Sequence, residues 1–130
     1  MMQHLGAAAL LVRDYDEAIA WFTNRLGFEL VTDTPLGEGK RWVLVRPSRG
    51  AQTPLLLAEA VGPAQVARIG DQAGGRVFLF LNSDDFSRDH ARMLAAGVVF
   101  REDPRDEAYG TVAVFEDLYG NLWDLIEPRG

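Results

Sequence analysis

In the first half of the chain, some hydrophobic positions form continuous runs, which are typical of buried strands, and others recur every four residues, which is typical of a helix. An apolar run over residues 5–12 predicts a buried strand. Ala18, Phe22 and Leu26 follow at four-residue spacing, which predicts one apolar face of a helix. Three more strands are expected at residues 28–32, 41–46 and 54–58, with a turn at residues 36–39. The first half therefore predicts the order strand, helix, strand, strand, strand.

Polar residues mark the ends of this predicted helix. Asp14 is a suitable N-cap because its carboxylate can accept a hydrogen bond from a free backbone N–H, and Glu17, three residues later, completes a capping-box pair. Gly27 provides the flexible residue at which a helix commonly stops. The second half carries the same signals, since Asp84 and Asp85 open a helix that Gly97 closes.

The second half repeats the order of the first. Strands are expected at residues 77–81, 98–101, 111–115 and 122–126. Landmarks recur at nearly one spacing, 68 to 71 residues: Asp14 with Asp85, Gly27 with Gly97, Trp42 with Val112, and Leu56 with Asp124. We predict an α+β protein of one domain, residues 1–130, with two tandem βαβββ modules at about 1–59 and 76–130. Residues 60–75 form the connector, with a short helix at 63–69.

Composition excludes several kinds of site. The 130 residues include no cysteine, which excludes disulfides, thiolate metal sites and cysteine nucleophiles. The two histidines, His4 and His90, are too few for an imidazole-rich site. The 13 basic residues against 19 acidic ones argue against nucleic acid or an anionic membrane as a partner.

No targeting or membrane segment is predicted. The apolar run at residues 5–12 is shorter than the roughly 18 residues that a spanning helix needs. It also lacks a basic segment before it and a cleavage site after it, so it does not match a signal peptide. We therefore expect a cytoplasmic protein.

Several segments together resemble the vicinal oxygen chelate superfamily, which includes glyoxalases, bleomycin-resistance proteins and extradiol dioxygenases. The resemblance spans residues 5–127 and is carried by LLVRDYDEAIAWFTNRLGFEL, RWVLV, FLNSDDF, AAGVVF and YGTVAVFEDLYGNLWDL. It implies paired βαβββ modules whose mixed sheets curl around a cleft, and a homodimer. In metal-dependent members it implies metal ligands on the first and last strands of each module, with the metal acting as a Lewis acid.

The resemblance assigns the metal-ligand positions to Ala7, Leu56, Phe78 and Asp124. Three of these side chains cannot coordinate a cation, and a metal site needs three or more protein donors. His4 lies three residues before Ala7, so strand alternation turns it to the opposite face. We therefore expect no cofactor, although a divalent metal at a non-standard site stays an alternative.

Asp124 is the leading candidate for a functional or catalytic group. A carboxylate inside an apolar strand either faces a ligand, where it fixes that ligand or moves a proton, or pairs with an arginine or backbone N–H groups. Asn82 either contacts a ligand or caps the next helix. The full set of candidate ligand-binding residues is Ala7, Ala9, Trp42, Leu56, Phe78, Phe80, Asn82, Tyr109 and Asp124.

Three functions are compatible with this set. The first is a metal-free binding protein of the glyoxalase/bleomycin-resistance type that holds an apolar or aromatic small molecule beside Trp42, Phe78 and Phe80. The second is a glyoxalase-, lyase- or dioxygenase-like enzyme with a non-standard metal site. The third is a metal-free catalyst that uses Asp124 as its acid or base. The sequence favours the first and leaves open whether the protein is an enzyme.

Overall fold

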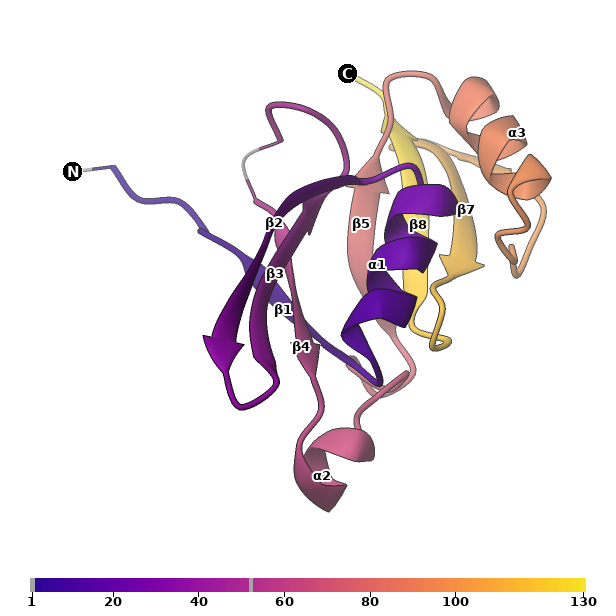
Figure 1. Cartoon of the computed structure of the whole chain (residues 1–130). Helices are drawn as coiled ribbons and strands as arrows, with labels where there is room; N and C mark the ends of the chain where they lie inside the picture. Colours follow the sequence, from indigo (N-terminus) through magenta and orange to yellow (C-terminus); the bar gives the residue numbers. More distant parts are fainter. Residues whose placement is uncertain (1, 52) are drawn as a thin grey trace. The chain divides into compact units, whose positions relative to one another are not determined.

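The computed structural model describes residues 2–51 and 53–130 and divides the chain into two compact units (Figure 1). Unit 1 is Met1–Ile69 and unit 2 is Gly70–Gly130. The boundary between them falls inside the predicted connector. No helix among the described residues is long and apolar enough to cross a membrane.

Unit 1 has a four-stranded mixed sheet with one main helix (Figure 1). Strand β1 pairs in parallel with β4, whereas β4 and β3, and β3 and β2, are antiparallel, which gives the order β1-β4-β3-β2. The short helix α2 follows the last strand. The elements are β1 (Ala8–Val12), α1 (Tyr15–Asn24), β2 (Glu29–Gly37), β3 (Lys40–Arg46), β4 (Leu55–Glu59) and α2 (Gly62–Val66).

Unit 2 repeats this topology, with the sheet order β5-β8-β7-β6. Again the first strand pairs in parallel with the last, and the other pairs are antiparallel. The elements are β5 (Val77–Asn82), α3 (Phe86–Ala95), β6 (Arg105–Glu107), β7 (Gly110–Glu116) and β8 (Leu122–Pro128). The α+β class and the two tandem βαβββ modules are confirmed.

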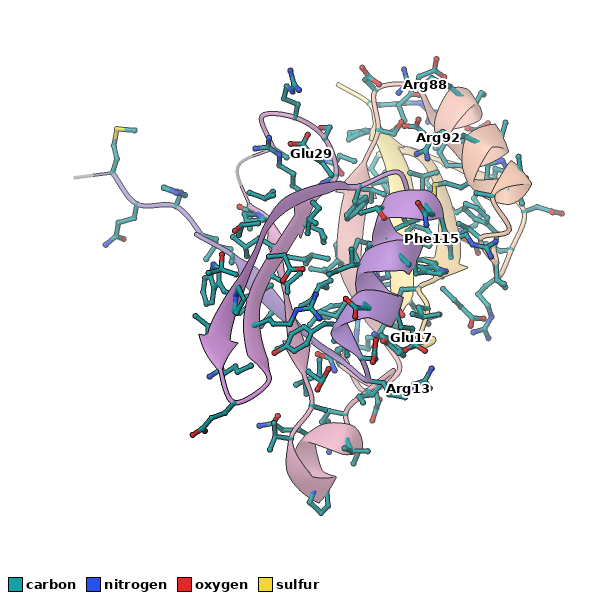
Figure 2. The ribbon with its side chains drawn as sticks, in the orientation of Figure 1. Arg13, Glu17, Glu29, Arg88, Arg92 and Phe115 are labelled. Carbon is teal, nitrogen blue, oxygen red and sulfur yellow. The ribbon has the colours of Figure 1, made fainter. Side chains whose placement is uncertain are left out.

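Both predicted helix caps are present. The Asp14 side chain accepts a hydrogen bond from the Glu17 backbone N–H at 2.8 Å, and Asp85 accepts one from Arg88 N–H at 3.1 Å. Arg13 and Glu17 also form an ion pair across the start of α1 (Figure 2). Gly27 follows α1 with a φ of 75°, a conformation that favours glycine. The polar signals therefore predicted where both helices begin. Helix α1 ends at Asn24, so Leu26, which was predicted on its apolar face, lies beyond the helix.

The strand predicted at residues 98–101 is wrong. In the structure, this segment contacts β7 through one bridge, Phe100 with Phe115, and through two backbone hydrogen bonds at 2.8 and 2.9 Å. The regular strand on that edge of β7 is β6, at Arg105–Glu107. The physical reason is that a side chain replaces the backbone acceptor there: Glu102 Oε2 accepts the hydrogen bond from Val114 N–H at 3.1 Å. Pro104, which has no N–H to donate, then separates this segment from β6.

Several other boundaries differ from the predictions, three of them as follows. Strand β2 extends to Gly37, because it pairs with β3 as far as the turn at residues 38–39. Strand β4 begins at Leu55 and ends at Glu59, one residue later than predicted at each end. Helix α2 stops at Val66, although residues 63–69 were predicted helical.

Each long helix covers one face of its own sheet. In unit 1 the fully buried side chains include Leu10 and Val12 of β1 and Phe22 of α1. In unit 2 a series of ring contacts leads from α3 to the sheet: the His90 and Phe100 rings are 4.5 Å apart, and the Phe115 and Trp123 rings are 5.7 Å apart (Phe115 is labelled in Figure 2). These contacts leave the other face of each sheet without a helix from its own unit.

Candidate functional site

Asp124 lies on the face of the unit 2 sheet that points away from α3. Its register partners are Phe80 on β5 and Val114 on β7, and directly paired residues share a sheet face. Trp123, the preceding residue, is 2% exposed and stacks on Phe115 on the helix side. Alternation therefore places Asp124 on the opposite face.

The Asp124 carboxyl is buried and incompletely paired. Asp124 is 9% exposed, and its Oδ1 atom has no hydrogen-bond partner among the described residues. Burial raises the pKa of Asp124 above the usual 3.8, the positive charge of Arg105 lowers it, and the negative charge of Glu102 raises it again. The net increase favours the neutral acid, which can donate a hydrogen bond.

Arg105, the nearest positive charge, is held by other acceptors. Its Nε donates to both Glu102 oxygens at 3.0 and 3.1 Å, and its Nη1 donates to Glu107 at 2.9 Å. Together with a side-chain hydrogen bond to Tyr109, these contacts raise the pKa of Arg105 above its usual range. Arg105 therefore acts on Asp124 through its charge rather than through a hydrogen bond.

The helix-free face of unit 1 is apolar. Leu56 is half-buried and pairs with Ala9 on β1 and Leu44 on β3. Trp42, two residues before Leu44 on the same strand, is 44% exposed. A pocket of about 920 Å³ adjoins this face, and its lining includes Leu11, Leu36, Trp42, Leu56, Glu59 and Val61. This surface can contact apolar or aromatic groups.

The structure brings together some of the predicted site residues. Phe80, 65% exposed, lies opposite Asp124, and Tyr109, 53% exposed, bonds with Arg105 on the same sheet. Phe78 is half-buried and lies where the register of β5 against β8 is irregular. Asn82 ends β5 with an exposed side chain.

Asn82 and Ala7 do not take the structural positions that the sequence suggested. Asn82 does not cap the following helix, because Asp85 provides that cap. Ala7 is exposed and precedes β1, so it is not a strand residue. Ala9, which the sequence also named, is the residue that pairs with Leu56.

The residues present do not fit the metal site that the family resemblance implies. Ala7, Leu56 and Phe78 have no donor atom on their side chains. Among residues 2–51 and 53–130, no group of three or more histidine, aspartate or glutamate side chains could hold a metal ion. His4 is exposed before β1, and His90 is stacked at 5.3 Å on Phe86.

Sequence reasoning missed the charged cluster beside Asp124. Glu102, Arg105 and Glu107 come together because β6 pairs with β7 and Glu102 bonds to the β7 backbone. The alternating charges of the segment REDPRDE were the available signal. The strand predicted at residues 98–101 covers only the first residue of this segment.

Asp117, which lies in the segment YGTVAVFEDLYGNLWDL, was not predicted to have a structural role. It is 5% exposed and joins the start of β8 to the β7–β8 turn. It accepts four hydrogen bonds of 3.0 to 3.1 Å: from the backbone N–H groups of Tyr119 and Asn121, the Asn121 amide and Trp123 Nε1. Its role is to shape this turn and to orient Trp123.

Comparison with known proteins identifies the family. Residues 3–125 match the Glyoxalase/Bleomycin resistance protein/Dioxygenase superfamily, so the chain belongs to this superfamily. An uncharacterised protein of Shewanella frigidimarina is 56% identical over 128 residues, covering 98% of this chain and 95% of that protein.

Two solved structures share both the fold and a moderate sequence identity. UcmS2 is 30% identical with a TM-score of 0.84, over 98% of this chain and 99% of its own. TnmS3 of Streptomyces sp. CB03234, described as an antibiotic-binding protein, is 30% identical with a TM-score of 0.79, over 98% of each chain.

Proposed function

We propose that this protein binds a small apolar or aromatic molecule on the helix-free face of one of its sheets, without a metal ion. The observation that carries the proposal is the exposure of large apolar side chains there, Trp42 at 44% and Phe80 at 65%. Exposed aromatic surface is costly in water and is typical of a contact surface. The non-coordinating side chains at the family's ligand positions support binding without a metal.

The relatives support the same proposal. TnmS3, which shares the fold and 30% of the sequence, is an antibiotic-binding protein. Small organic molecules suit an apolar surface that carries a few polar groups. The family resemblance further leads us to propose a homodimer in the cytoplasm, which size-exclusion chromatography with light scattering would test for the dimer.

Tryptophan fluorescence provides the test of binding. Titration with fluorene, a planar aromatic hydrocarbon, should change the emission of Trp42 in a saturable way, because Trp42 is the tryptophan on the helix-free face of unit 1. Trp42→Phe should remove most of the response. The matched control Trp21→Phe, on the helix α1, should retain it.

Metal removal completes the test. Dialysis against a chelator should leave the affinity for fluorene unchanged. An absence of saturable binding across a panel of planar aromatic compounds would contradict the proposal, and so would a loss of binding after chelation that added metal restores.

A catalytic role for Asp124 is the second candidate. The observation that favours it is the buried Asp124 carboxyl, whose pKa is raised and which lies beside the exposed Phe80. Buried carboxyls with raised pKa values are common at acid–base sites. If the protein is an enzyme, Asp124→Asn should abolish turnover while largely retaining ligand affinity. Retained turnover would exclude Asp124 as the acid or base.

A further inference from the structure

Helix α2 differs from the longer helix of unit 1 in how little it is packed. Helix α1 buries Tyr15, Ala18 and Phe22, whereas no residue of α2 is buried. Figure 1 shows α2 beyond the end of β4, apart from the four strands of the unit 1 sheet. A helix of 5 residues is too short to be stable by itself in water, so little holds α2 in this position.

The segment around α2, residues 61–69, is hydrogen-bonded within itself; we call it the strap. Just before it, the Ala60 N–H donates to a β1 carbonyl at 2.9 Å and fixes the chain to the sheet. Inside it, the Val61 N–H donates to Gln65 Oε1 at 2.9 Å, and backbone hydrogen bonds of 3.0 to 3.2 Å join residues 63–69. These bonds preserve the shape of the strap without attaching it to the sheet.

The glycines at the two ends of the strap have different surroundings. Gly62 and Gly70 both have a φ of 79°, a backbone angle that favours glycine. A Cβ atom on Gly70 would lie 2.2 Å from the Tyr119 carbonyl oxygen, so Gly70 is closely packed and held in place. A Cβ atom on Gly62 would meet no atom within 4 Å. Gly62 therefore has room to change its backbone angles and is suited to be a pivot.

The strap borders the pocket of unit 1. Val61 and Gln65 belong to the lining of this cavity of about 920 Å³, together with Leu36 and Trp42 of the β2–β3 hairpin. Leu36, Trp42 and Val61 are all exposed, so apolar surface around the pocket lies in water. Val66, next to Gln65 on α2, is also exposed, at 55%, and does not belong to the described lining of the pocket. A cavity of this size can hold a small organic molecule.

We infer that the strap bends at Gly62 and closes over an apolar molecule in the unit 1 pocket, which brings Val66 into contact with that molecule. Closing over solvent would remove little apolar surface from water, whereas closing over an apolar molecule would bury Val66. The open strap is therefore the state of the free protein. This inference rests on the proposed binding function and adds a moving part to the same site.

Val66 distinguishes a closing strap from a rigid pocket, because it lies outside the described lining while the strap is open. Val66→Ala should weaken the binding of fluorene about fivefold, since closure buries the methyl groups that the variant lacks. The matched control Val99→Ala, at an exposed position of unit 2 (57%), should bind fluorene like the natural protein. Titration of tryptophan emission measures both affinities, and thermal melting checks that both variants fold.

Gly62 can be tested against a glycine of the same geometry. Gly62→Ala makes the present φ costly and should change the rate of fluorene release about tenfold, measured by stopped-flow fluorescence. The control Gly50→Ala meets the same strain, with a φ of 85° and no atom within 4 Å of an added Cβ. It should leave the release rate unchanged, and equal rates in both variants would overturn the role of Gly62 as pivot.

Amide hydrogen exchange tests the strap directly. In the free protein, residues 61–69 should exchange faster than those of β4, because α2 buries no side chain. Saturation with fluorene should slow exchange in the strap about tenfold, whereas the loop at residues 47–51 of the same unit should not change.

The outcomes separate the strap from the binding function. If fluorene binds while exchange in the strap and the affinity of Val66→Ala stay unchanged, closure is overturned and the binding function stands. Exchange of the strap as slow as that of β4 in the free protein would overturn closure without any ligand. If neither fluorene nor the panel of planar aromatic compounds binds, both proposals fail.

Discussion

The two units share a framework but differ in where they carry polar groups. Both have the same strand order and an aspartate N-cap on the long helix. Both also use a glutamate of the last strand to accept a hydrogen bond from the first helical N–H: Glu59 from Tyr15, and Glu127 from Phe86. Among the described residues, however, all the buried polar side chains belong to unit 2: Ser83, Asp117, Asn121 and Asp124.

The difference is sharpest at one register position. Leu56 pairs with Ala9 in unit 1, and Asp124 pairs with Phe80 in unit 2. The N-caps of α1 and α3 are alike because the first N–H groups of each helix need hydrogen-bond acceptors. The helix-free faces carry no such requirement, so the two units can differ there without loss of the helix N-termini.

The largest effect should come from breaking the turn between β7 and β8 of unit 2. Asp117→Ala should lower the free energy of unfolding by about 3–5 kcal/mol, because it leaves the buried donors of Asn121 and Trp123 unpaired. Urea denaturation followed by tryptophan fluorescence would measure this loss. The exposed Asp103→Ala serves as the control and should change stability by less than about 0.5 kcal/mol. An equal effect of both variants would refute the structural role of Asp117.

Sequence patterns predicted the framework well because it depends on local rules. Helix caps, apolar spacing and glycine stops act over a few residues, and Asp14, Asp85 and Gly27 function as those rules predict. The family resemblance placed Asp124 on the last strand, and alternation separated it from Trp123. These features required no knowledge of how distant segments pair.

The charged cluster depends on long-range pairing, and the sequence patterns therefore did not predict it. Arg105 lies near Asp124 only because β6 begins after Pro104 and pairs with β7. The sequence predicted a strand at residues 98–101, where a single bridge to β7 forms, and none at Arg105–Glu107. The unpaired state of Asp124 could not be predicted either, since it depends on Arg105 bonding to Glu102 and Glu107.

Making the two units alike at the divergent position should stabilise the protein. Asp124→Leu replaces an unpaired buried carboxyl with an apolar side chain, and we expect a gain of about 1–2 kcal/mol at neutral pH. The pKa of Asp124 is raised by folding, so the native state binds the proton more tightly than the unfolded chain does. The natural protein therefore loses stability as the pH rises from 3.8 through the raised pKa.

The gain from Asp124→Leu should accordingly be smaller in acid than at neutral pH. Urea denaturation of both proteins across this pH range would measure it. The reciprocal change, Leu56→Asp, should destabilise the protein, because it creates a half-buried carboxyl on an apolar face. A stability loss in Asp124→Leu, or a gain independent of pH, would show that the carboxyl is satisfied in the folded protein.

The smallest effects test the shared part of the framework. Asp14→Ala and Asp85→Ala each remove one hydrogen bond to a backbone N–H, at 2.8 and 3.1 Å, and each should cost about 1 kcal/mol. Amide hydrogen exchange should show faster opening in the first turn of the affected helix, with the other helix less changed. Because the caps are chemically identical and Glu59 and Glu127 support the same N-termini, the two costs should agree within about 0.5 kcal/mol. A cost confined to one module would mean that the modules differ in their folding framework as well as in their helix-free faces.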